Sequence, residues 1–259
     1  MDSHTGHVRA ARDSDIPIIE AWLPKDESVP SLAVNWKLTK KVYQERGMLV
    51  WEDSMTERPI AYFWGSLHTH DSVLEIHPAY RGKGIGRAFV EHLMAMSREQ
   101  GEPLLEIECA HETSKEFWMV MGFDVREHGW TMHGPQLIGQ QILRLRRQLP
   151  EGPKIPVTVA FLPESAAYDD SDVTPFVMHA LVGAATPSGG IELNERVAYF
   201  DLDDGKDLVI EIVVAGKRVY RGKAKYQEAR AIGVEPCKRG FAVDTLNLDR
   251  AILGSSHDE

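Results

Sequence analysis

One glycine-rich segment constrains this chain more than any other. It reads HPAYRGKGIGRAF and runs from His77 to Phe89. Gly82, Gly84 and Gly86 lie two residues apart, a strand-like run precedes them, and a helical pattern follows. Glycines allow a sharp turn and let a ligand approach the backbone closely. The first N–H groups of a helix lack internal partners and attract anions. The segment therefore predicts an anion-binding turn between a strand and a helix.

The spacing of the glycines separates three kinds of phosphate loop. A P-loop requires GxxxxGK[ST], which this chain lacks. The dinucleotide fingerprint requires GxGxxG, and the third spacing fails here. A third pattern, [Q/R]-x-x-G-x-[G/A], is matched without substitution by Arg81, Gly84 and Gly86. Lys83 and Arg87 add positive charge to the same loop.

This loop resembles the pyrophosphate-binding motif of the GNAT superfamily of acyl-CoA N-acyltransferases. The helical segment FWMVMGF at residues 117–123 resembles the second acetyl-CoA motif of that superfamily. The order of expected elements from residue 8 to about residue 147 is also similar, so the resemblance covers a little over half of the chain. It implies an α/β (α+β) fold of the GNAT type, with a mixed central sheet flanked by helices. It also implies an acetyl-CoA-dependent N-acyltransferase.

The residue patterns of the first half predict alternating strands and helices. Strands are expected at residues 7–12, 48–53, 59–67, 72–77, 103–110, 123–127 and 140–146, and helices at 14–23, 31–47, 86–101 and 113–122. The runs at 48–53 and 59–67 flank a polar turn and predict a hairpin.

The second half reads as β-rich. Residues 146–156 hold three prolines and a glycine and predict a linker, so we expect a first domain at 1–150 and a β-rich domain of unknown role at 151–259. Three strands are expected within residues 196–226, with turns at Asp204-Gly205 and Ala215-Gly216. Residues 173–185 are interpreted as a short helix.

The resemblance implies which residues hold acetyl-CoA. They are the loop residues Arg81, Gly82, Lys83, Gly84, Ile85, Gly86 and Arg87, together with Ile76, His77, His111 and Trp118. Ile76 and His77 end the strand that positions the thioester, where a backbone N–H stabilises charge on the carbonyl oxygen. His111 stands where the superfamily commonly has a pantetheine-binding asparagine. Trp118 stands where a tyrosine often protonates the leaving thiolate; it packs on the cofactor or belongs to the core.

A base must remove a proton from the attacking amine. His70 is the first candidate, because its reference pKa of about 6.5 suits this task and because arylalkylamine-acetylating members carry a histidine or glutamate at matching positions. The alternative is a surface histidine in a turn. Glu106 and Glu108 are the next candidates; they share one face of their strand, and that face is either the acceptor slot or a solvated edge.

Composition limits the partners. The net charge of −10 argues against nucleic acid as the main partner. No apolar run reaches the ~20 residues of a membrane span, and Cys109 and Cys237 are the only cysteines, so we expect a cytoplasmic protein without a metal site or membrane contact. The expected acceptor is a small-molecule or protein amine, and a homodimer is left open. The alternative function is a non-catalytic acyl-CoA sensor or a partner-binding protein.

Overall fold

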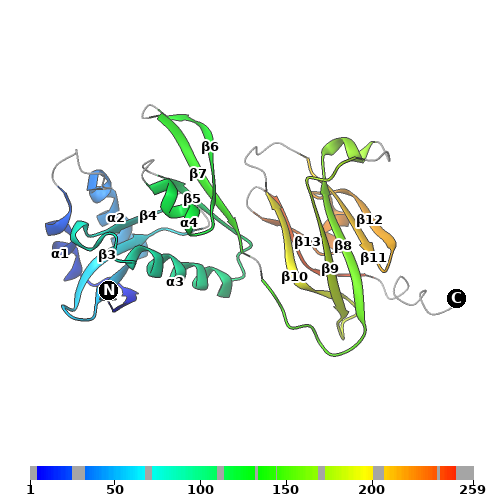
Figure 1. The fold of residues 1–259 in the computed structure, drawn as a ribbon, viewed down its shortest axis with the longest axis horizontal. Helices are drawn as coiled ribbons and strands as arrows, with labels where there is room; N and C mark the ends of the chain where they lie inside the picture. The colour runs from blue at the N-terminus through cyan, green and yellow to red at the C-terminus, as the bar shows by residue number, and fades with distance from the viewer. Residues whose placement is uncertain are drawn as a thin grey trace. The chain divides into compact units, whose positions relative to one another are not determined.

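The structure is a computed structural model of the chain, and it divides into two compact units, Met1–Gln141 and Ile142–Glu259 (Figure 1). The residues that it describes are 5–24, 33–67, 72–109, 114–131, 134–143, 145–168, 173–200, 207–237 and 240–248. The units meet at Gln141, nine residues before the boundary that the linker composition predicts.

The first sheet of unit 1 has four antiparallel strands in the order β1-β2-β3-β4. These strands are β1 (Gly6–Ala10), β2 (Leu49–Asp53), β3 (Arg58–Trp64) and β4 (Val73–Ile76). The expected hairpin between the second and third strands is present, with Leu49 opposite Phe63. β4 is therefore the last strand of its sheet in the part of the chain that the structure describes.

Helices cover both faces of this sheet, which explains why β3 is buried along nearly all its length. One face packs on α1 (Asp15–Trp22), on α2 (Trp36–Arg46) and on the 3-10 turn Ala33–Asn35 that precedes it. Ile19, Trp36, Val50, Tyr62 and Trp64 belong to that core. The other face packs on α3 (Ile85–Glu99), whose Phe89 lies 6.2 Å from Trp51 and 6.4 Å from Phe63, between ring centroids. The alternation of side chains along each strand separates these two cores.

The second sheet of unit 1 has three strands in the order β5-β7-β6. Its elements are β5 (Leu104–Cys109), α4 (Lys115–Val120), β6 (Asp124–Thr131) and β7 (Gly134–Ile142). β5 ends this sheet as β4 ends the other one. The two sheets join where the N–H of Glu106 donates to the carbonyl of Leu67 at 2.6 Å. The sheet of unit 1 is thus divided between β4 and β5 (Figure 1).

Unit 2 contains a seven-stranded antiparallel sheet in the order β12-β11-β8-β9-β10-β14-β13. Its elements are β8 (Lys154–Leu162), the 3-10 turn Glu164–Ala167, β9 (Val177–Ala185), β10 (Ile191–Phe200), β11 (Val209–Val214), β12 (Lys217–Lys223), α5 (Gln227–Ala231), β13 (Val234–Cys237) and β14 (Gly240–Leu246). Its buried core includes Val159, Phe161, Leu193, Ile210 and Val243.

One expectation for the second half is wrong. The helix expected at residues 173–185 is the strand β9, which pairs with β8 along its length; β-branched residues and tertiary pairing decide such short apolar runs. β10 and β11 follow each other in the chain but do not pair with each other, because β11 pairs with β8 and β12. The expected turn at Ala215-Gly216 is present, and both residues have positive φ. The turn expected at Asp204-Gly205 lies outside the described residues.

The expected linker at residues 146–156 is partly ordered against the second sheet. The N–H of Arg147 donates to the carbonyl of Asn194 at 2.9 Å, and the N–H of Arg196 donates to the carbonyl of Leu145 at 3.0 Å. β8 then begins at Lys154, inside the predicted linker. Backbone pairing with β10 therefore holds the first residues of this segment.

Candidate functional site

The glycine loop lies between β4 and α3, as its pattern predicts. After β4, residues Pro78–Tyr80 form a 3-10 turn, and Gly82 and Gly84 have φ of +73° and +83°. Gly84 is the N-cap of α3, and its carbonyl accepts from the N–H of Ala88 at 3.0 Å. Because left-handed backbone costs other residues about 1–2 kcal/mol, this path favours glycine.

The start of α3 suits a phosphate group. The N–H groups of Ile85, Gly86 and Arg87 open a helix and have no carbonyl one turn earlier to bind. The helix dipole adds partial positive charge at the same place. Lys83 and Arg87 are exposed, and the ammonium of Lys83 lies 4.9 Å from the ring centroid of Tyr80. Ile85 differs from its neighbours, because its side chain is buried in the core.

Arg81 turns away from the loop and anchors it to β4. One guanidinium nitrogen donates to the carboxylate of Glu75 at 2.6 Å, and Nε donates to the carbonyl of Ile76 at 3.1 Å. The Glu75 side chain is buried, whereas that of Arg81 is partly exposed. The sequence pattern placed Arg81 in the anion site; its contacts give it the task of positioning the loop.

The register of β4 decides which backbone groups face the gap between the sheets. The N–H of His77 donates to the carbonyl of Ile60 at 2.9 Å. Ladder bonds alternate along an antiparallel strand, so the N–H groups of Leu74 and Ile76 face the other edge of β4, toward β5. The N–H of His77 is therefore not available to an acyl group, and this part of the expectation is corrected. The expectation for Ile76 stays a prediction.

The imidazole of His77 lies away from α3. Its ring is 5.1 Å from that of Trp22 on α1 and 5.1 Å from that of Tyr80, between centroids. Its Nδ1 accepts from the N–H of Ala79 at 3.1 Å. Burial lowers the pKa of His77, and the nearby charge of Arg81 lowers it further. The ring is thus neutral at pH 7 and carries its proton on Nε2.

The two candidate carboxylates on β5 have different surroundings. Glu106 is fully buried, and Gln140 of β7 donates an amide hydrogen to its carboxylate at 3.0 Å. Glu108 is exposed. Cys109 points to the opposite face of β5, where it contacts Ser114 at the start of α4. Burial raises the pKa of the Cys109 thiol to about 11.

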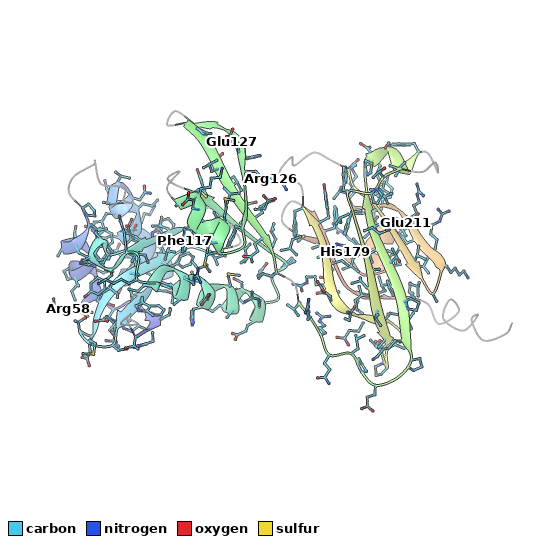
Figure 2. The ribbon with its side chains drawn as sticks, viewed as in Figure 1. Arg58, Phe117, Arg126, Glu127, His179 and Glu211 are labelled. Carbon is cyan, nitrogen blue, oxygen red and sulfur yellow. The ribbon has the colours of Figure 1, made fainter. Side chains whose placement is uncertain are left out.

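α4 turns a phenylalanine toward the loop. A Cβ on Gly86 would lie 3.5 Å from Cε2 of Phe117 and 3.8 Å from Cγ1 of Ile76, so these three residues meet where β4, α3 and α4 converge. Figure 2 labels Phe117 on α4. Trp118 lies within the core, 5.0 Å from Phe117 and 5.2 Å from Phe123 between ring centroids. The pattern of the segment singled out Trp118 and missed Phe117.

Two candidates, His70 and His111, lie outside the described residues. The structure also identifies Glu75, whose buried carboxylate holds Arg81. Among the residues that the structure describes, no group of three or more histidines, cysteines, aspartates or glutamates could hold a metal ion. No helix in that part of the chain is long and apolar enough to cross a membrane.

The site therefore belongs to an α/β protein in which a glycine loop opens a helix beside a divided sheet. Residues 16–123 match the family model described as the acetyltransferase (GNAT) family, and this segment is a GNAT domain. GNAT proteins use acetyl-CoA as their acyl donor. The second unit is not covered by this family model. A search among curated proteins found no significant match.

Several solved structures are similar to part of the chain. Ard1 from Thermoplasma volcanium is 15% identical over 53% of this chain and 97% of its own, with a TM-score of 0.43. The ribosomal-protein-S18-alanine N-acetyltransferase from Escherichia coli is 17% identical over 54% of this chain and 93% of its own, with a TM-score of 0.40. The putative acetyltransferase yncA from Salmonella typhimurium, solved with acetyl-CoA, is 20% identical over 53% and 93%, with a TM-score of 0.38.

Proposed function

We propose that this chain transfers an acetyl group from acetyl-CoA to a primary amine, with both reactants bound at the same time. The single observation that carries this proposal is the loop at Gly82–Gly84, which opens α3 beside the free edge of β4. Acetyl-CoA supplies the activated acyl group. The residues of the chain bind the donor, orient it and handle the proton.

The donor's diphosphate is proposed to bind the N–H groups of Ile85, Gly86 and Arg87. Gly86 has no side chain to fill the space beside Phe117 and Ile76, so a ligand can approach the backbone at the start of α3 closely. The N–H groups of Leu74 and Ile76 then face the pantetheine arm along the edge of β4. Either N–H can stabilise negative charge that develops on the carbonyl oxygen during transfer.

The acceptor amine is proposed to approach from the face of β5 that carries Glu106 and Glu108. That face lies opposite Cys109 and α4. The amine nitrogen forms a bond to the carbonyl carbon and loses a proton to a base, directly or through water. The carbon–sulfur bond breaks, and the thiolate takes up a proton. Holding both reactants together supplies an effective molarity on the order of 10⁵ M or more.

The buried position of Trp118 favours a second candidate, an acyl-CoA sensor without turnover, because no indole proton serves the leaving thiolate. The full chain would be incubated with acetyl-CoA and a panel of amines, including an N-terminal alanine peptide, a lysine peptide and an arylalkylamine. We expect amine-dependent release of thiol. Tight binding of CoA without thiol release for any amine would instead favour the sensor.

A further inference from the structure

Unit 1 contains a pocket on the side of β4 that faces α1. It has a volume of about 540 Å³, which lies within the range of small-molecule sites. α1 lines it with Pro17, Ile18, Ala21 and Trp22; the β2–β3 hairpin and β3 contribute Thr56, Arg58 and Ile60; and the start of the glycine loop contributes His77 and Tyr80.

The walls of this pocket are aromatic and apolar. The rings of Trp22 and Tyr80 flank the ring of His77, each at 5.1 Å between centroids. Ile60, Ile18 and Pro17 provide the aliphatic part of the lining. Aromatic faces at this spacing suit a flat ligand, because offset stacking and edge contacts both operate at ring distances of about 4.5–7 Å.

The charge of the pocket is positive. No aspartate or glutamate lines it. Arg58, which Figure 2 labels at the start of β3, is exposed, and its guanidinium has no hydrogen-bond or ion-pair partner among the described residues. The hydroxyl of Thr56 is already committed, because it donates to Asp53 at 2.7 Å. The guanidinium of Arg58 is therefore available to a planar carboxylate, which it can bind through two parallel N–H groups.

The pocket is separate from the proposed donor site. Ile76 points toward Gly86 and α3, whereas His77, the next residue, points toward Trp22 and α1. Successive side chains of a strand project to opposite faces, so the two sites lie on opposite sides of the same backbone. They share the segment from His77 to Tyr80, which continues into Arg81 and the glycines.

We propose that this pocket binds small aromatic carboxylates, with the ring against Trp22 and His77 and the carboxylate on Arg58. The neutral His77 contributes its Nε2 hydrogen as a second donor, since Nδ1 already accepts from Ala79. A ligand here contacts the same turn that presents the glycine loop. Its binding therefore changes the affinity for CoA, a coupling that rests on the proposed function.

The test uses 2-naphthoate and its neutral counterpart 2-naphthalenemethanol, titrated into the full chain by calorimetry without CoA. We expect naphthoate to bind more tightly than the alcohol. Arg58→Met should weaken naphthoate binding by about tenfold, as expected for loss of a hydrogen-bonded charge. Arg98→Met, which removes an exposed arginine from the end of α3, is the matched control and should bind like the wild type. Ala21→Phe should block the pocket from the exposed face of α1.

Equal affinity for acid and alcohol, or unchanged naphthoate binding by the Arg58 and Ala21 variants, would overturn the proposal. In a second titration, CoA is added with and without saturating naphthoate. A changed CoA affinity supports the coupling, and an unchanged one refutes it. Because the first titration contains no CoA, failure of the pocket and failure of the proposed function give different results.

Discussion

Arg81 donates a 2.6 Å hydrogen bond to the buried carboxylate of Glu75 and a second hydrogen bond to the carbonyl of Ile76. The arginine of the loop is thus bound to the strand that precedes the loop. The two contacts set where β4 ends and where the turn toward α3 begins. The sequence pattern assigns this arginine to a ligand, whereas its contacts hold the glycine loop against β4.

Replacing Glu75 should therefore weaken donor binding even though Glu75 faces away from α3. Glu75→Gln removes the charge that holds the Arg81 guanidinium, and hydrogen bonds to charged groups contribute about 1.5–3 kcal/mol. We expect CoA affinity to fall about tenfold by calorimetry. Glu91→Gln, at an exposed position of α3, is the control. Equal CoA affinity in both variants would contradict the positioning role of Glu75.

Two glycines lie at opposite ends of α3, and substitutions at these positions distinguish the effect of backbone strain from an effect on ligand binding. Gly84 and Gly101 have φ of +83° and +77°, and an added Cβ would meet nothing within 4 Å at either position. Gly84→Val and Gly101→Val should each lose about 1–2 kcal/mol of stability. Only the Gly84 variant should lose CoA binding, because its side chain occupies the approach to the helix start. CoA binding by both variants, at matched folded fraction, would exclude this loop as the donor site.

The carboxylates of β5 can be distinguished by paired substitutions. We expect Glu106→Gln to lower kcat by at least about 100-fold if Glu106 accepts the amine proton, because a positioned base contributes about 10²–10⁴-fold. Gln140 can still hydrogen-bond the new amide, so the fold should persist. Glu108→Gln should have the smaller effect, since Glu108 is exposed. If Glu108→Gln lowers kcat and changes the pH–rate profile more than Glu106→Gln does, Glu108 is the base instead.

Cys109 should not serve as a nucleophile. Burial raises the pKa of its thiol to about 11, so little thiolate exists at pH 8. We predict that Cys109→Ala keeps kcat within a few-fold of the wild type. Intact-mass spectra of the wild type with acetyl-CoA alone should show no covalent acetyl group. A stable acetyl adduct on Cys109 would demonstrate a two-step transfer through the enzyme.

A buried ion pair holds α1 against the first sheet. Arg9 donates to Asp15 at 2.6 Å and, through Nε, to Glu52 at 2.6 Å, and the Asp15 side chain is only 4% exposed. Loss of one partner of such a pair costs about 3–5 kcal/mol. We expect Asp15→Asn to lower the free energy of unfolding of unit 1 by about 3 kcal/mol at pH 7, measured by denaturant titration. Asp124→Asn, at an exposed pair, is the control.

The pH dependence of this effect has a defined sign. Burial alone would raise the pKa of Asp15, but the hydrogen bonds and charge of Arg9 outweigh it and hold the pKa below its ordinary value. The stabilisation is therefore complete above the ordinary aspartate pKa of about 3.9 and is lost as the pH falls through the lower pKa of the folded state. The difference between wild type and Asp15→Asn should persist at pH 5 and shrink in stronger acid.

The sequence predicted the parts of the site that depend on backbone shape. Glycine spacing located the loop, and the polar turn between two apolar runs located the β2–β3 hairpin. The sequence did not predict where Arg81 points. The direction of Arg81 depends on the side chain of Glu75 facing inward, and a shift of one residue in the register of β4 would turn Glu75 to the other face. The alternation of side chains along this segment also places Ile76 and His77 on opposite faces.

The sequence pattern also did not predict which elements far apart in the chain pack or pair with each other. α4 is six residues long, so packing against β6 and the start of α3 decides that Phe117 faces the loop and Trp118 the core. In unit 2, β11 pairs with β8, and the paired residues are 47 to 57 positions apart in the sequence, although β10 is the nearer neighbour of β11 in the chain. Local turn chemistry carries no information on such a partner.

The division between β4 and β5 has a consequence for how the protein persists in a cell. Among the described residues, β4 and β5 each lie at the edge of a sheet, a position that tends to leave ladder groups unpaired and that sheets usually protect. If a pantetheine arm lies there, it pairs with the edge of the sheet for as long as the donor is bound. Ligands that bind only the native state raise its stability in proportion to the logarithm of their concentration. The amount of intact protein would then rise and fall with the supply of acyl-CoA, so that metabolism sets its lifetime as well as its turnover.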